Sequence, residues 1–371
     1  MNDKVFSFFR VTPDCPEWLD WKWQYSHRIT TVEALSQIIS LGEKEKHEIE
    51  ASLGSFRMAI TPYYASLMDP EDPMCPVRMQ AVPSINEIHA EPWEMRDPLS
   101  EDNGSPVPNI VHRYPDRVLF LVTRQCAMYC RHCVRKRHVG EEDFLISESQ
   151  KKEAIDYIAR TPQIRDVLVS GGDPLCMSDG ALEEIIAKLR AIEHVEIIRI
   201  GTRAPVVLPM RITANLLAML KKYHPIWMNV HFNHPRELTA QSRKACAGIA
   251  DVGIPLGNQS VLLRNINDNT ATMKELSLKL VQTRVRPYYI YQCDLCEGSE
   301  HFRTNVETGI EIIRSLTGNI SGFAVPRFVI DTPNGGGKVP IDPGFVVSLD
   351  DEKIEIRNYE GRVYSYPQPR R

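Results

Sequence analysis

The sequence predicts an α/β fold, in the form of a partial (β/α)6 barrel with a helical region before it and a β extension after it. Short apolar, β-branched runs alternate with amphipathic helical segments from about residue 117 onwards, which is typical of parallel βα units. A closed TIM barrel has eight such units, so six units predict an incomplete, TIM-like barrel. The six runs span 117–123, 166–170, 195–200, 227–232, 254–263 and 286–293.

The regions on either side of the barrel have a different character. We expect an N-terminal helical region over 1–110, the partial barrel over 111–300, and a lysine-bearing segment with the C-terminal β extension over 301–371. Thr30, with Glu33 three residues later, predicts a capping box at the start of a helix. A further apolar run covers 323–331, and the tail segments FVVSL, KIEIRN and RVYSYP predict antiparallel strands.

Composition and charge exclude several classes of protein. The chain has 371 residues and a formal net charge of −4, a balance that favours neither a nucleic acid nor a membrane surface as partner. No apolar run is long enough to span a bilayer, and the N-terminal residues MNDKVFSFFRVTPD lack the features of a signal peptide. Nine cysteines, mostly scattered, fit a disulfide framework poorly. We therefore expect a cytoplasmic protein whose clustered thiols bind metal or take part in catalysis.

Residues that could take part in catalysis or ligand binding follow the predicted strands. In barrels of this kind the chemistry lies at the carboxyl ends of the strands. A stretch with three cysteines follows the first strand and SGGD (170–173) ends the second. His231 ends the fourth strand and Asp294 follows the sixth. The sequence therefore predicts one functional rim.

The three-cysteine stretch, RQCAMYCRHCVRKR, has the spacing C-x₃-C-x₂-C at Cys126, Cys130 and Cys133. Structural zinc normally takes four protein ligands. His132 is adjacent to a cysteine and would strain a tetrahedral site, and the distant Cys293 and Cys296 do not give the usual paired spacing. An iron–sulfur cubane with three protein ligands leaves one iron open to a small molecule. In SGGD, glycines let a backbone approach a ligand closely, although a simple βα turn explains the same residues.

A second stretch, DTPNGGGKVP (331–340), carries glycines before a lysine. It is not a phosphate-binding P-loop, because Thr332 stands where that motif needs glycine and Val339 where it needs a hydroxyl. Three glycines before Lys338 predict a mobile segment. The amine of this lysine could form a Schiff base with an aldehyde cofactor. The alternative is a surface turn with an exposed lysine.

The cysteine spacing in this context resembles the radical S-adenosylmethionine (SAM) signature, in which SAM completes the ligands of a [4Fe-4S] cluster. Beyond that motif, roughly residues 5–367 resemble the lysine 2,3-aminomutase family. The resemblance implies a radical SAM barrel, pyridoxal 5′-phosphate (PLP) beside SAM, and an isomerase that moves the α-amino group of L-lysine to C3 to give β-lysine. Its most specific segments are RMAITPYYASLMDPEDP, SPVPNIVHRYPDRVLFLVT, HFNHP, GNQSVLLR, RPYYIYQCDL, EHFRT and GGGK.

The resemblance also implies a role for each site residue. Cys126, Cys130 and Cys133 hold the cluster, and Lys338 is the lysine that binds PLP. Arg113 and Arg117 hold the PLP phosphate, which suits the planar fork of a guanidinium. The remaining residues are assigned to SAM or PLP (Ser170, Gly171, Gly172, Asp173, His231, Gln259, Tyr291) or to the substrate (Arg135, Asp294, Asp331).

The substrate residues indicate a cationic amino acid. Arg135 binds the substrate carboxylate in the family, and Asp294 with Asp331 holds the distal amine of lysine. Burying that ammonium requires negative partners, whereas two carboxylates would repel a glutamate side chain. An arginine 2,3-aminomutase remains an alternative, because a guanidinium also suits two carboxylates.

Other implications concern metals and partners. Clostridial-type family members hold zinc with cysteines that this chain lacks: Asn269 stands at one such position and no cysteine follows Cys296. We therefore expect no structural zinc. We expect a reductant protein of flavodoxin or ferredoxin type, a homo-oligomer, and no nucleic-acid or membrane partner. Two further alternatives are a radical SAM enzyme acting on a protein or nucleic acid, and a non-catalytic protein with a zinc-bound cysteine loop.

Overall fold

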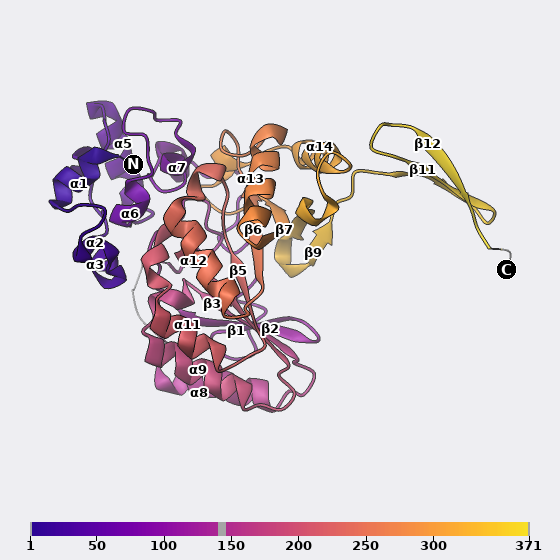
Figure 1. Ribbon diagram of the computed structural model, residues 1–371, viewed down its shortest axis with the longest axis horizontal. Helices are drawn as coiled ribbons and strands as arrows, with labels where there is room; N and C mark the ends of the chain where they lie inside the picture. Colours follow the sequence, from indigo (N-terminus) through magenta and orange to yellow (C-terminus); the bar gives the residue numbers. More distant parts are fainter. Residues whose placement is uncertain (1, 140–145, 370–371) are drawn as a thin grey trace.

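The computed structural model describes residues 2–139 and 146–369, and one sheet of nine strands lies at its centre (Figure 1). The order of the strands across the sheet is their order along the chain. The second to eighth strands are parallel to their neighbours, whereas the first and ninth pair antiparallel at the two ends. The strands are β1 (Ile110–Tyr114), β2 (Arg117–Thr123), β3 (Asp166–Gly171), β4 (Ile197–Gly201), β5 (Ile226–Val230), β6 (Leu256–Leu262), β7 (Val285–Gln292), β8 (Arg327–Thr332) and β9 (Gly337–Pro340).

The predicted fold class, a partial TIM-like barrel with a helical region before it and a β extension after it, is confirmed. The six predicted runs coincide with β2 to β7, with ends shifted by at most two residues. The run at 323–331 overlaps β8, which adds a seventh parallel strand because its backbone pairs with β7 at Tyr289 and Arg327. The tail segments form a separate antiparallel sheet, as expected: β10 (Val346–Leu349), β11 (Lys353–Arg357) and β12 (Val363–Pro367).

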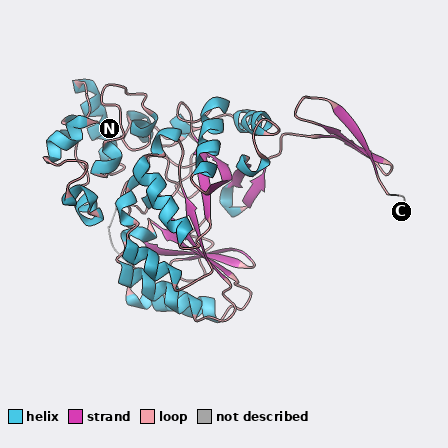
Figure 2. Ribbon diagram, viewed as in Figure 1, coloured by secondary structure: helices cyan, strands magenta, loops and turns pink. Residues whose placement is uncertain are grey.

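Helices cover one side of the parallel strands, and Figure 2 shows them in cyan along the magenta sheet. Alternation along each strand explains this layering. In β3, Val167 and Val169 are fully buried in the core, whereas Leu168 and Ser170 line a cavity on the other side. The helices of the barrel are α8 (Glu148–Ala159), α9 (Asp179–Arg190), α10 (Ala204–Val207), α11 (Ala214–Lys221), α12 (Ala240–Asp251), α13 (Thr270–Gln282) and α14 (Val306–Leu316).

The N-terminal region is a set of short helices that shares the core of the barrel. Its buried Trp18, Tyr63 and Tyr64 belong to the same hydrophobic cluster as the strands. The predicted capping box at Thr30 is wrong: Thr31 is the N-cap, and its Oγ1 accepts from Ala34 N at 3.3 Å, because the helix begins one residue later. The elements are α1 (Asp3–Phe9), α2 (Pro16–Leu19), α3 (Trp21–Ser26), α4 (Val32–Ser36), α5 (Glu43–Leu53), α6 (Pro62–Ala65), α7 (Pro76–Met79) and the 3₁₀ turn η1 (Ile85–Ile88).

The C-terminal sheet projects away from the rest of the molecule (Figure 1). Its strands β10 and β12 are exposed along their whole length. Across residues 2–139 and 146–369, none of the helices combines the length and apolar character that a bilayer crossing requires.

Candidate active site

One large cavity, of about 840 Å³, runs along the parallel strands, from first residues such as Asp166 of β3 to the loops beyond their carboxyl ends. Every residue that the sequence singled out for the site lines it, although these residues come from segments spread over more than 200 positions. The structure therefore brings the predicted rim together, while the role of each residue stays a prediction. The lining includes Arg113, Arg117, Cys126, Cys130, Cys133, Arg135, Ser170, Gly171, Gly172, Asp173, His231, Gln259, Tyr291, Asp294, Asp331 and Lys338.

The three cysteines lie on the loop that follows β2. Burial raises the pKa of the Cys126 and Cys133 thiols, and neighbouring thiols raise it further. Nη1 of Arg203 donates to the sulfur of Cys130 at 2.8 Å. In the described part of the chain, no three His, Cys, Asp or Glu side chains are grouped so as to hold a single metal ion. A buried thiol is ionised readily only beside a cation, so these sulfurs suit a metal cluster rather than a single ion.

The glycines of SGGD are required by a close approach between two backbones. Gly171 has φ +125°, a conformation that favours glycine. A Cβ on Gly172 would collide with the carbonyl oxygen of Gln125 at the start of the cysteine loop. Hydrogen bonds join the same segments, from Gly172 N to Thr123 O at 2.6 Å and from Asp173 N to Gln125 O at 2.7 Å. The turn therefore supports the cysteine loop, and its contact with SAM stays a prediction.

Asp173 holds the loop after β4 in place. Its carboxylate accepts from Thr202 Oγ1 at 2.7 Å, from Arg203 N at 2.8 Å and from Leu175 N at 3.0 Å. Burial nevertheless raises the pKa of Asp173. These contacts position Arg203 beside the cysteine loop.

Arg135 is paired with a carboxylate that the sequence did not identify. Nε and Nη2 of Arg135 donate to Glu101, at 2.9 Å to Oε2 and 2.7 Å to Oε1. Glu101 is 4% exposed. Burial alone would raise the pKa of Glu101, but Arg135 and Arg137 lower it overall. The guanidinium is therefore fixed in the cavity wall by a buried ion pair.

Lys338 and Asp331 face each other on the β8–β9 hairpin. The two residues are paired in register, and Nζ of Lys338 lies 3.0 Å from each carboxylate oxygen of Asp331. The same ammonium lies 5.3 Å from the centre of the Tyr291 ring. Lys338, which is predicted to bind PLP, therefore forms an ion pair with Asp331, which is predicted to bind the substrate.

Tyr114 connects Lys338 with the two predicted phosphate-binding arginines. Its hydroxyl accepts from Lys338 N at 2.9 Å, and the Arg117 guanidinium lies 3.9 Å from the centre of its ring. Arg113, one residue before it, donates to the carbonyl oxygen of Leu99. Both arginines and the lysine therefore lie near Tyr114 in the lining of the cavity.

Two histidines in the lining of the cavity have unpartnered ring nitrogens. Within the described residues, His231 Nε2 and His132 Nδ1 are buried without a hydrogen-bond partner. The two rings are 5.5 Å apart, and burial lowers the pKa of His231 to about 3, so this ring is neutral. Gln259 Nε2 donates to the Tyr291 hydroxyl at 3.0 Å. These side chains offer polar atoms to a bound ligand.

Asp294 should make the stability of the substrate-free protein depend on pH. Burial and the neighbouring Asp331 raise its pKa from an ordinary value of 3.8 to about 7. The folded state then holds a proton that the unfolded state has released, so the free energy of unfolding falls as the pH rises from about 4 to about 7. Urea unfolding across this range should show this loss in the parent protein and a smaller one in Asp294→Asn. Parallel pH profiles for the two proteins would contradict the prediction.

Comparison with known proteins places the chain in a family. The Lysine-2,3-aminomutase family model matches residues 313–371, and the Radical SAM superfamily model matches residues 120–276. An L-lysine 2,3-aminomutase from Clostridium subterminale is 55% identical over 100% of this chain and 88% of its own length. The chain belongs to the lysine 2,3-aminomutase family.

Other members of the lysine 2,3-aminomutase family give the range of this similarity. An L-lysine 2,3-aminomutase from Bacillus subtilis is 53% identical over 96% of this chain and 76% of its own length. A glutamate 2,3-aminomutase from Clostridioides difficile is 45% identical over 98% and 85%. A solved structure of SuiB from Streptococcus suis bound to S-adenosylmethionine aligns with 59% of this chain and 51% of its own, with a TM-score of 0.45 and 13% identity.

The residues of this aminomutase fit the cofactors of its family: a [4Fe-4S] cluster, SAM and PLP. The three half-buried cysteines share one loop, and the Arg203 guanidinium donates to Cys130, which suits an anionic sulfur cluster. The orphaned ring nitrogens offer polar atoms to SAM, and two arginines with Lys338 suit an aldehyde that carries a phosphate.

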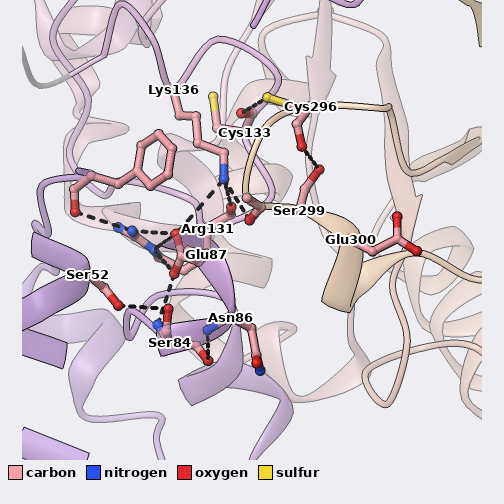
Figure 3. A network of polar contacts seen from close by, with 12 residues as sticks. Ser52, Ser84, Asn86, Glu87, Arg131, Cys133, Lys136, Cys296, Ser299 and Glu300 are labelled. Atoms are coloured by element: carbon pink, nitrogen blue, oxygen red, sulfur yellow. Dashed lines mark hydrogen bonds and ion pairs between the residues drawn. The ribbon is translucent and has the colours of Figure 1, made fainter. Parts of the chain in front are cut away.

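A buried ion network joins the N-terminal region of this aminomutase to its cysteine loop (Figure 3). Nε and Nη2 of Arg131, which follows Cys130, donate to the Glu87 carboxylate at 2.9 and 2.6 Å. Lys136 Nζ lies 3.9 Å from the same carboxylate and donates to Gly298 O at 3.0 Å. Cys296 lies against this loop, with its sulfur 3.7 Å from the carbonyl oxygen of Cys133. The loop is therefore held from two sides.

Replacing Glu87 should strongly destabilise the fold. Its side chain is fully buried with Arg131, and removing one partner of a buried pair typically costs about 3–5 kcal/mol. Glu87→Gln should therefore lower the free energy of unfolding by about that amount in denaturant titrations of the cluster-free protein. Glu43→Gln, in an exposed pair with Lys46, should change it by less than about 0.5 kcal/mol. Equal effects of the two substitutions would contradict this account of the network.

Proposed function

We propose that the chain catalyses the 2,3-migration of the amino group of L-lysine, giving β-lysine. The observation that carries this proposal is the cavity itself. In a member of this family, one cavity is lined by the three cysteines together with Arg135, Lys338 and two aspartates. The bound cofactors supply a hydrogen-abstracting radical from SAM at the cluster and a carbonyl on PLP that holds the migrating nitrogen.

The cavity has separate charges for the two ends of lysine. We assign the substrate carboxylate to Arg135, whose Nε and Nη2 already donate to Glu101, so that its Nη1 is the nitrogen for the substrate. We assign the side-chain ammonium to Asp294 and Asp331. The Lys338–Asp331 pair supports this assignment, because Asp331 already accepts a primary ammonium at 3.0 Å.

The remaining residues position the cofactors. We assign the cluster to Cys126, Cys130 and Cys133 and the PLP phosphate to Arg113 and Arg117. We assign the attachment of PLP to Lys338, which pairs with Asp331 on the same hairpin. The neutral His231, with Gln259 and Tyr291, binds SAM or PLP and helps to exclude water from the cavity.

The test is anaerobic incubation with SAM, PLP, a reductant and a mixture of amino acids, followed by chromatography for β-amino acids. We expect β-lysine, and its formation should require SAM. Mainly β-arginine would favour the second candidate, since two carboxylates also suit a guanidinium. Only β-glutamate, or no product from free amino acids, would contradict the proposed function.

We also propose partners and a location. A one-electron carrier of flavodoxin or ferredoxin type would reduce the cluster, and purified carriers can be compared by the rate of cluster reduction. All nine cysteines are free thiols, which supports a reducing, cytoplasmic compartment. Fractionation of cells that express the protein tests that location.

The C-terminal sheet supports a homo-oligomer. Leu349, Ile354 and Tyr366 are opposite one another on β10, β11 and β12, so they share one face of the sheet. Leu349 and Tyr366 are 64% and 66% exposed. An apolar face of this kind suits a second copy of the chain. Light scattering should show that Leu349→Asp with Tyr366→Asp lowers the molar mass; an unchanged mass would contradict this role of the sheet.

A further inference from the structure

Arg203 is a buried cation that touches a proposed cluster ligand. It lies between β4 and α10 and is 7% exposed. Its Nη1 donates to the sulfur of Cys130 at 2.8 Å. Hydrogen bonds from charged donors are stronger than neutral ones, and hydrogen bonds to the sulfurs are among the factors that set the potential of an iron–sulfur cluster.

The direction of the Arg203 side chain is fixed by buried partners. Nη2 donates to Gln80 Oε1 at 2.6 Å and to Glu237 Oε1 at 2.9 Å. Glu237 is itself fully buried and also accepts from the Tyr64 hydroxyl at 2.8 Å and from Asn233 N at 2.7 Å. With its carboxylate held by donors on both oxygens, Glu237 acts as a rigid support for the guanidinium.

The backbone of Arg203 is fixed as well, because its N–H donates to the buried Asp173 carboxylate. The position of the guanidinium is therefore fixed by its contacts with Gln80 and Glu237 and by the backbone contact with Asp173, and not by its contact with Cys130. Glu237 compensates the charge of Arg203 overall, so the main effect on the sulfur is the direct hydrogen bond.

We propose that Arg203 is a positioning residue for the cluster: its hydrogen bond to the Cys130 sulfur stabilises the more negative, reduced state and so raises the reduction potential. The proposal rests on the assignment of the three cysteines to the [4Fe-4S] cluster under the proposed function. Supplying the electron to SAM requires that the cluster first accepts one from the reductant. A residue that shifts this equilibrium controls how much of the enzyme is ready to react.

The chain offers a matched control in Arg131. It is also buried and follows Cys130 directly, but it donates to Glu87 and to the carbonyl oxygens of Arg57 and Phe56. Among the described residues, the Arg131 side chain forms no hydrogen bond to a sulfur atom. Replacing Arg131 breaks its pair with Glu87 and removes a buried arginine from the same loop, but leaves the bond from Arg203 to Cys130 in place.

The experiment is an anaerobic redox titration of the reconstituted enzyme without substrate. The electron paramagnetic resonance signal of the reduced cluster is measured at each potential, and the iron content per chain is determined for each protein. We compare the parent protein with Arg203→Gln, Arg203→Lys and Arg131→Gln. At a fixed potential, Arg203→Gln should lower the ratio of reduced to oxidised cluster about tenfold, a shift of about 59 mV for one electron. Arg203→Lys should show a smaller shift, and Arg131→Gln less than about half of the Arg203→Gln shift.

The outcomes separate this inference from the proposed function. If the parent protein binds no [4Fe-4S] cluster, the proposed function fails. If the parent has the cluster and Arg203→Gln has the parent's potential, or Arg131→Gln shifts it equally, the inference is overturned. If Arg203→Gln retains no iron, Arg203→Lys decides: a lower potential than the parent supports the inference, and an unchanged potential overturns it.

Discussion

Lys338→Ala is expected to abolish both PLP attachment and β-lysine formation. The visible absorption of a lysine-bound pyridoxal ring should be absent, and the rate should fall on the order of 10³-fold or more, because attachment to the lysine gives the cofactor a high effective concentration and a fixed orientation. The cluster should remain, since Lys338 lies on the β8–β9 hairpin and the cysteines on the loop after β2. Absorption spectra, iron content and product chromatography measure the three quantities.

The control for this prediction is Lys222→Ala. Lys222 is exposed at the end of α11 and pairs with Glu183, so its loss should leave the spectrum and the rate unchanged. A pyridoxal absorption band that persists in Lys338→Ala would show that another amine holds PLP. Loss of iron in this variant would instead indicate a damaged fold.

The parts of the site that sequence alone could predict share a local signature. The spacing of Cys126, Cys130 and Cys133 and the glycines before Lys338 are short motifs, and the strand pattern places them at one rim. The cavity gathers them as expected. The roles of Asp294 and Asp331 came from resemblance, because a single aspartate after a strand has no motif of its own.

The residues that sequence analysis missed are defined by contacts between distant segments. Glu101 lies in an irregular stretch, 34 positions before its partner Arg135. Arg203 is separated from Cys130 by 73 positions, and both sit on loops whose approach depends on how the strands curve. Only burial and distance reveal such pairs, since a charged residue in a loop is usually solvated. The one-residue error at Thr30 has a local cause: Thr31 is an equally good cap.

Asp294→Asn is expected to raise KM for lysine about 100-fold at pH 8, with kcat much less affected. At that pH Asp294, with its pKa near 7, is largely ionised in the free protein. Its loss leaves the substrate ammonium with Asp331 alone. Breaking a buried ion pair costs about 3 kcal/mol at the lower end, and 1.4 kcal/mol corresponds to a tenfold change. Steady-state kinetics with lysine measures the change.

Asp294 is the more informative of the two aspartates, because Asp331 also binds Lys338 and its replacement would disturb PLP attachment as well. Asp294→Glu, which keeps the charge, should retain more of the lysine affinity than Asp294→Asn. Asp251 forms an exposed ion pair with Arg284, so Asp251→Asn should leave KM for lysine unchanged. The parent's KM should fall as the pH rises through about 7, because ionised Asp294 attracts the ammonium, and this dependence should disappear in Asp294→Asn. An unchanged KM in Asp294→Asn would mean that the distal amine binds elsewhere in the cavity.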